Sequence, residues 1–214
     1  MPANSISDNP LYFIAWILAI LVAFSTHEFS HAWAATLLGD STPKRAGRLT
    51  LNPLAHIDFL GFLMLIFVGF GWGKPVPFNP YNLKNQRWGA TLVALAGPLA
   101  NLVNIVLWGS ILKLVAAYGL FPPENLLVQF LILLVDLNIV LLIFNLIPIP
   151  PLDGSKFLFD LLDSPKYDNA KIFLETKGPL VLIGFILLDN FSGLNLLSRL
   201  FAVAMQLVYG IFLT

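Results

Sequence analysis

Four long runs of almost exclusively apolar residues dominate this chain of 214 residues, and they cover positions 11–38, 90–117, 126–147 and 194–213. A helix needs about 20 apolar residues to cross the hydrocarbon core of a bilayer, so each run is long enough to span it. Hydrophobic residues make up 57% of the chain and charged residues 11%. Soluble domains contain about 45–50% and about 25% of these classes. The chain is therefore predicted to be an all-α polytopic membrane protein.

Two shorter apolar runs, residues 59–71 and 180–188, are too short for a simple span. The first contains several glycines and is expected to enter the membrane and return. Prolines in the connections exclude helix interiors there, and we expect short extended pieces at 48–51 and 74–78. In total the sequence predicts about four to six transmembrane segments, with short extended or re-entrant pieces on the cytoplasmic side.

Most of the Lys and Arg residues lie in three connections, 39–58, 73–89 and 148–179, whereas the N-terminal stretch and the loop 118–125 contain none. Because basic connections stay on the cytoplasmic side, we expect all three there and the N-terminus outside. The protein is then expected to be a multi-pass protein of the cell (plasma) membrane, with its basic connections toward the cytoplasm. Residues 59–71 form a hairpin in this arrangement, because both flanking connections face the same side.

Charge and cysteine content exclude several classes of function. Twelve Lys and Arg residues balance twelve Asp and Glu residues, so no net positive field is available to attract nucleic acid. Cysteine is absent, which excludes disulfides and thiolate metal ligands. We expect a single membrane-embedded domain, 1–214, with hydrophobic C-terminal segments at 178–214.

The first apolar run contains the sequence His27-Glu28-Phe29-Ser30-His31. On a helix, residues i and i+4 share a face, so His27 and His31 can hold one zinc ion while Glu28 approaches a bound water. Ionisable side chains are costly inside a membrane, and their presence there indicates function. The alternative is that the three side chains satisfy one another in a polar helix–helix contact.

A zinc site needs a third protein ligand, and the candidates are His56, Asp58, Glu124, Asp136 and Asp153. Asp153 stands out because the prolines before it end the preceding span and free the carboxylate to point back into the helices. The alternative for Asp153 is a turn aspartate before a glycine. For His56 the alternative is a hydrogen bond to a loop backbone.

One aspartate and two glycines within the predicted spans are expected to have structural roles. For Asp136 we favour a polar contact with Asn101 or Asn104 over a role as a backup ligand. Gly97 and Gly109 are expected to allow close helix approach.

Three motifs in this order (HEFSH at 27–31, GPLAN at 97–101 and NLIPIPPLDG at 145–154) resemble the site-2 protease family of intramembrane zinc metalloproteases. Residues 48–58 and 71–80 resemble its compact prokaryotic branch, which lacks PDZ and CBS domains. The resemblance implies that His27, His31 and Asp153 bind one Zn²⁺ and that Glu28 is the general base for a zinc-activated water. It also implies that Asn145 holds the substrate backbone or the developing oxyanion.

The same resemblance implies an endopeptidase that cuts peptide bonds in or near transmembrane helices of membrane proteins, in regulated intramembrane proteolysis. Its catalytic core would lie at about 11–160, with the active site toward the cytoplasmic side. Its partners would be transmembrane-helix substrates and the lipid bilayer. Two other classes fit the residues alone: a membrane metal-ion transporter, in which the ligands form a transit site, and a non-catalytic membrane scaffold.

Overall fold

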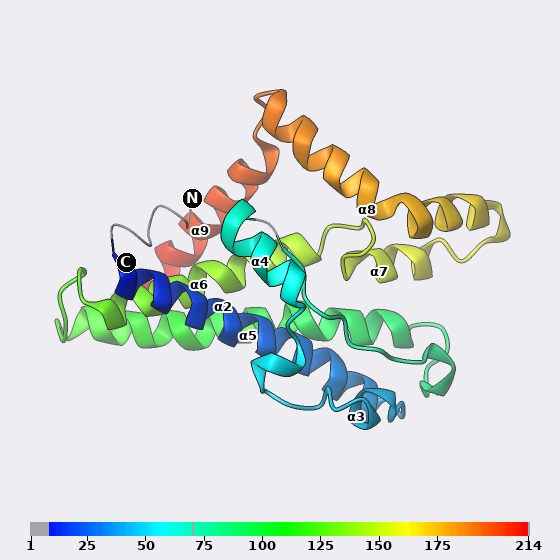
Figure 1. Ribbon diagram of the computed structural model, residues 1–214, viewed down its shortest axis with the longest axis horizontal. Coiled ribbons are helices and arrows are strands. Elements are labelled where there is room, and N and C mark those ends of the chain that lie inside the picture. Colours follow the sequence, from blue (N-terminus) through cyan, green and yellow to red (C-terminus); the bar gives the residue numbers. More distant parts are fainter. Residues whose placement is uncertain (1–8, 70, 214) are drawn as a thin grey trace.

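The computed structural model describes residues 9–69 and 71–213, and the fold over these residues is helical (Figure 1). Within them the only β-pairing is an isolated bridge between Ile57 and Gly73, so the predicted all-α class is confirmed. The α-helices are α2 (Pro10–Leu37), α3 (Thr42–Arg45), α4 (Phe59–Val68), α5 (Gly89–Ala117), α6 (Leu126–Asn145), α7 (Gly154–Leu161), α8 (Asp168–Phe191) and α9 (Leu196–Phe212). Three short 3₁₀ turns are η1 (Pro53–Ala55), η2 (Pro80–Asn82) and η3 (Pro165–Tyr167).

Helices α2, α5 and α6 lie side by side and form the centre of the molecule (Figure 1). Each is long and apolar enough to cross a membrane. A fourth crossing is reached when α8 and α9, which meet at a bend of 84°, are counted as one broken span. The polytopic prediction is confirmed, although the three to four candidate spans reach only the lower limit of the four to six that were predicted.

Helix α2 packs against its neighbours through one row of residues spaced four apart. The row consists of Ala15, Ala19, Ala23, His27, His31 and Ala35, and every one of these side chains is buried. Alanines at this spacing let helix backbones approach closely, which is how helices associate where the surroundings are as apolar as the side chains. Ile14, Leu18 and Trp33, on other faces of α2, are exposed and suited to contact lipid.

The segment after Asp58 forms a hairpin, as expected from its length. Helix α4 has 10 residues, about half of what a span needs, and ends at Gly69, whose φ of 81° is in the left-handed region. The two ends of the segment meet, since Ile57 bridges Gly73 and the Lys74 amide donates to the His56 carbonyl at 2.8 Å. The predicted outward-facing N-terminus, residues 1–8, and position 70 of the hairpin lie outside the described residues.

The pieces expected to be extended, 48–51 and 74–78, are irregular and form no ladder with each other within the described chain. The buried Arg48 side chain joins them instead. Its guanidinium donates to the carbonyls of Ala55, Lys74 and Pro75. These bonds hold the base of the hairpin to the connection that precedes it.

The C-terminal part differs from the expected boundaries. Residues 168–179, which were predicted to belong to a connection, form the first half of α8, and the run 180–188 is its second half. Lys171, Glu175 and Lys177 are good helix formers that an apolar pattern does not register, so the helix begins well before the apolar run.

Helix α9 returns to the central helices and contacts α5 and α6. The Tyr209 hydroxyl donates to Asp136 at 2.7 Å, so the predicted pairing of Asp136 with Asn101 or Asn104 is wrong. Residues two apart on a helix point in nearly opposite directions, and Asp136 therefore faces α9 while Asn138 faces α5. Gly109 allows the close approach that was expected, because a Cβ there would lie 2.7 Å from the Phe212 ring.

Candidate metal centre

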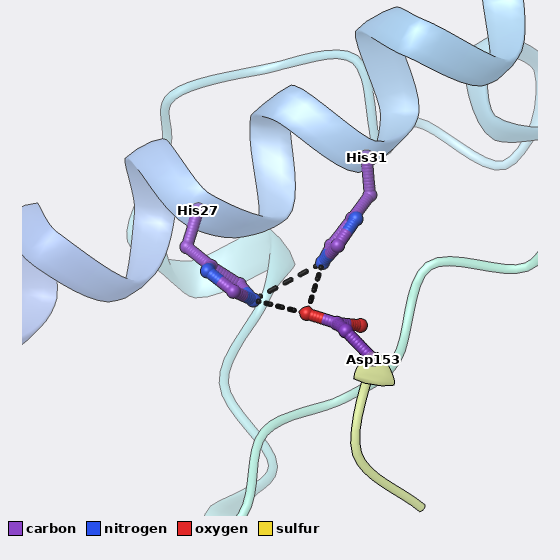
Figure 2. Close-up of side chains that lie close together, drawn as sticks. All are labelled: His27, His31 and Asp153. Carbon is purple, nitrogen blue, oxygen red and sulfur yellow. Dashed lines mark hydrogen bonds and ion pairs between the residues drawn. The ribbon is translucent and has the colours of Figure 1, made fainter. Parts of the chain in front are cut away.

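Three side chains from two distant parts of the chain converge beside helix α2 (Figure 2). His27 and His31 project from the same face of α2, and their Nε2 atoms are 3.1 Å apart. Asp153, at the start of α7, places Oδ2 at 3.2 Å from the Nε2 of His27 and 3.3 Å from that of His31. These are the three side chains that the described residues bring together as a candidate metal-binding group.

The outer nitrogen of each imidazole fixes which nitrogen faces the centre. The Nδ1 of His31 lies 2.8 Å from the Val93 carbonyl, which can only accept, so this nitrogen must donate. The Nδ1 of His27 lies 2.6 Å from Oδ1 of Asn101, which also only accepts. Both Nε2 atoms therefore carry lone pairs, and both lone pairs are directed at the same small space. Metal-ligating histidines are usually held in this way.

The spacing of the three inner atoms fits zinc. Ligands arranged tetrahedrally about 2.0–2.1 Å from a zinc ion lie about 3.3 Å from one another, close to the separations measured here. Asp153 Oδ2 is buried and accepts no hydrogen bond, which leaves an unsatisfied charged oxygen facing two lone pairs. A divalent cation satisfies all three atoms, and three protein ligands leave one position open.

The loop before α7 explains how Asp153 reaches this point. Pro148, Pro150 and Pro151 prevent α6 from continuing, and the chain turns sharply before α7 begins at Gly154. A side chain at Gly154 would collide with the carbonyls of Leu146 and Ile147. The carboxylate of Asp153 makes no capping bond to α7, so it remains directed at the histidines.

Helix α5 supplies the wall behind the imidazoles at Gly97. A Cβ at this position would lie 2.5 Å from Cε1 of His27 and 2.5 Å from both Cε1 and Nε2 of His31. The expected close approach of helices at Gly97 is therefore an approach to the two candidate ligands themselves.

A cavity of about 500 Å³ adjoins the three side chains and opens between the helices and the connections. Glu28 and Asn145 line it together with both histidines and Asp153. The Asn145 amide donates to the Leu141 carbonyl of its own helix at 3.0 Å, which leaves its second N–H and its oxygen for another partner. Leu182 of α8 covers part of the cavity and is buried.

The other candidate ligands lie elsewhere. His56 is buried and its Nε2 bonds the Thr50 carbonyl at 2.8 Å, which is the loop-backbone contact weighed for it. Asp58 caps α4 by accepting from the Gly61 amide at 2.8 Å. Glu124 is exposed in the loop between α5 and α6, and Asp136 is bound to Tyr209.

The contact between Asn101 and His27 was not expected from the sequence. The available signal was the four-residue spacing of Gly97 and Asn101, which places both on one face of α5. The Val93 carbonyl, one further turn toward the start of α5, extends this face along the histidines. A backbone acceptor of this kind leaves no trace in the sequence.

Comparison with known proteins gives a consistent result. The model for peptidase family M50 matches residues 109–188. YwhC of Bacillus subtilis, named as a candidate zinc metalloprotease, is 41% identical over 149 residues, which cover 68% of each chain. MJ0611 of Methanocaldococcus jannaschii, named in the same way, is 33% identical over 150 residues, 69% of this chain and 71% of the relative.

Rip2 of Mycobacterium tuberculosis, also named as a candidate zinc metalloprotease, is 36% identical over 149 residues. The match covers 66% of this chain but 55% of Rip2, so the shared region is little more than half of that relative. No solved structure matches the chain.

Proposed function

The chain belongs to peptidase family M50, the site-2 protease family of membrane zinc metalloproteases, and on this premise we propose that it is an endopeptidase that cuts membrane-protein substrates in or near their transmembrane helices. It is thus an enzyme of the hydrolase class from a family whose substrates are membrane proteins. The observation that carries the proposal is the convergence of two imidazole lone pairs and one unsatisfied carboxylate oxygen beside a cavity that Glu28 lines.

We assign the roles as follows. His27, His31 and Asp153 bind one Zn²⁺ per chain. Zinc, when bound, supplies a Lewis acid that activates water at neutral pH and polarises a carbonyl. Glu28 takes the proton of the attacking water and later delivers it to the leaving amine nitrogen. Asn145 holds the substrate carbonyl or the developing oxyanion with the N–H that its own helix does not use.

Apolar surroundings next to the candidate metal centre support the proposal that the substrate is a transmembrane helix. A second cavity of about 290 Å³ adjoins the first and shares Phe24, Trp72 and Leu141 with it. Its other walls include Trp16, Phe62 and Leu65, so an unwound stretch of a transmembrane helix would find apolar contacts here next to the polar centre.

We further propose that residues 1–214 form one membrane-embedded domain, with the catalytic core at about 11–160. The basic connections are proposed to face the cytoplasm of the cell, with the N-terminus outside. In support, the Lys84 amide donates to the Leu38 carbonyl, so the connections after α2 and before α5 meet at one end of these helices.

The first experiment measures zinc per chain in detergent-purified protein, for the parent and for Asp153→Ala. We expect about one zinc in the parent and a marked loss in the variant, since two imidazoles alone bind zinc weakly. Asp163→Ala, at an exposed aspartate, is the matched control and should retain zinc. Absence of zinc from the parent protein, even after reloading, would rule out the catalytic proposal.

A second experiment separates a protease from a transporter or a scaffold. Single-span reporter proteins tagged on both sides of the membrane are co-expressed with the parent and with Glu28→Gln. Loss of cleavage by at least about 100-fold with zinc retained supports the role of Glu28 as a base. Glu28→Gln protein that cleaves as the parent does, or zinc transport that survives this change, would contradict the role.

A further inference from the structure

The contact that orients His27 is part of a ring of side-chain hydrogen bonds through three helices, which the backbone of α2 between Thr26 and His27 closes. Asn101 and Asn104 of α5 both donate their side-chain amides to Oδ1 of Asn138 on α6, at 2.8 and 3.1 Å. Asn104 also donates to the Thr26 hydroxyl of α2 at 2.8 Å, and Asn101 accepts from His27. The ring therefore starts and ends at neighbouring residues of α2, Thr26 and His27.

The three asparagines and the histidine of the ring are buried, and Thr26 is partly buried. Asn101 and Asn138 are fully buried, and Asn104 is 9% exposed. Polar groups placed in the membrane-crossing part of a helix need internal partners, because lipid offers none. Each amide in the ring consequently depends on the next.

One backbone carbonyl sets the direction of the whole ring. The Asn138 amide nitrogen donates to the Leu134 carbonyl at 2.7 Å, and a carbonyl can only accept. Asn138 must therefore direct its oxygen toward α5, and Asn101 must donate to this oxygen with its amide nitrogen. This leaves the Asn101 oxygen facing His27, which forces the proton of His27 onto Nδ1 and the lone pair onto Nε2.

We infer that Asn138 is a positioning residue of the zinc site: through Asn101 it fixes the tautomer and the ring orientation of His27, although it touches neither the imidazole nor the three converging atoms. This inference rests on the proposed zinc site. Without the Asn138 oxygen, the Asn101 amide has no partner on α6 and is free to rotate its nitrogen toward His27, where two donors would oppose each other. Zinc would then meet a His27 that carries its proton on the wrong nitrogen.

The test compares zinc affinity, by competition with a chelator, in detergent-purified parent, Asn138→Leu and Asn104→Leu. Asn138→Leu is expected to weaken zinc binding by about 10- to 100-fold, the range found when partners of metal-ligating histidines are removed. Each variant loses two hydrogen bonds between helices, those of Asn138 to Asn101 and Asn104 or those of Asn104 to Asn138 and Thr26, but Asn104→Leu leaves the Asn101–Asn138 bond intact. It should bind zinc nearly as the parent does. Equal losses in the two variants would overturn the inference, since packing alone would explain them.

A rescue variant distinguishes orientation from structure. Asp at position 101 has no nitrogen to rotate, so it accepts from the Nδ1 of His27 whatever Asn138 does. Asn101→Asp in the Asn138→Leu background is expected to restore most of the lost zinc affinity. If Asn138→Leu does not fold, Asn138→Ala takes its place: a loss of zinc affinity of tenfold or more supports the inference, and affinity equal to that of the parent contradicts it.

The outcome also separates this inference from the proposed function. If the parent protein binds zinc, and loses it with Asp153→Ala, the zinc site stands. Asn138→Leu protein that then binds zinc as tightly as the parent defeats the positioning role alone. A parent protein that binds no zinc defeats both.

Discussion

Among single residues, Gly97 shows how much the candidate metal centre depends on a position that has no side chain. The two imidazoles occupy the space that a Cβ of this residue would take. Helix backbone conformation does not require glycine here, because residue 97 lies within the regular helix α5. The requirement comes from the ligands on the neighbouring helix.

Gly97→Ala should therefore weaken zinc binding by about 10- to 100-fold, because His27 and His31 must move away from Asp153. Gly109→Ala is the matched control on the same helix, where the new methyl group would meet Phe212 of α9 instead. Chelator competition on both purified variants measures the effect. Similar zinc affinity in the two variants would show that the imidazoles tolerate the displacement.

The residue scale also marks the limit of prediction for the site. Four-residue spacing predicts that His27 and His31 share a face, and prolines before Asp153 indicate that the chain turns there; the structure brings the three together. Spacing along one helix does not show which residue of another helix lies opposite. The partners of His27 and Asp136, namely Asn101 and Tyr209, depend on how α5 and α9 dock, and this escaped prediction.

Between elements, Asp40 fastens the end of α2 to the connection that leads into α5. Its carboxylate accepts from the Thr42 amide and hydroxyl, from the Asn79 amide at 2.6 Å and from the Asn82 side chain at 2.9 Å. Burial acts to raise the pKa of Asp40, but the hydrogen bonds from Asn82, Thr42 and Asn79 outweigh it and lower the pKa from 3.8 to about 2. The carboxylate is thus held in its charged form.

Asp40→Asn is expected to lower the free energy of unfolding at pH 7 by about 2–4 kcal/mol, because donors then face an amide that is uncharged and itself donates. A lowered pKa stabilises the fold above the unfolded-state value, and this contribution disappears as the pH falls from about 4 to about 2. The difference between parent and variant should therefore shrink between pH 7 and pH 3. Unfolding in detergent at both pH values measures it, with Asp163→Asn as the exposed control; a difference that does not change with pH would contradict the role of the charge.

The long helices were the predictable elements. The runs 11–38, 90–117 and 126–147 correspond to α2, α5 and α6 within two residues at each end, because a membrane span is specified by its own composition. Helix α8 was not predicted in full, since its first half is polar. A contact between loop and helix holds that half in place, and the pattern of apolar residues does not reveal it. Gly178 lies against Pro150 of the loop that carries Asp153.

For the whole molecule, the proposed orientation can be tested cleanly because the chain contains no cysteine. Single cysteines at exposed positions Ala46, Gln86 and Asp163 report on the three basic connections, and one at Glu124 reports on the opposite loop. In intact cells an impermeant maleimide should label only the Glu124→Cys protein. Labelling of Gln86→Cys without Ala46→Cys would mean that residues 59–71 cross the membrane.

The row of residues spaced four apart on α2 places buried positions at regular intervals along the helix axis. Every position of the row is buried. Its depth in the bilayer depends on where along α2 the position lies. Exchanging the contents of positions 23 and 31 would shift the histidine pair by about 6 Å along the helix axis and turn it by about 40°, while keeping it on the buried row. Under the proposed function, the depth of the histidine pair in the bilayer would decide which peptide bond of a substrate helix comes within reach.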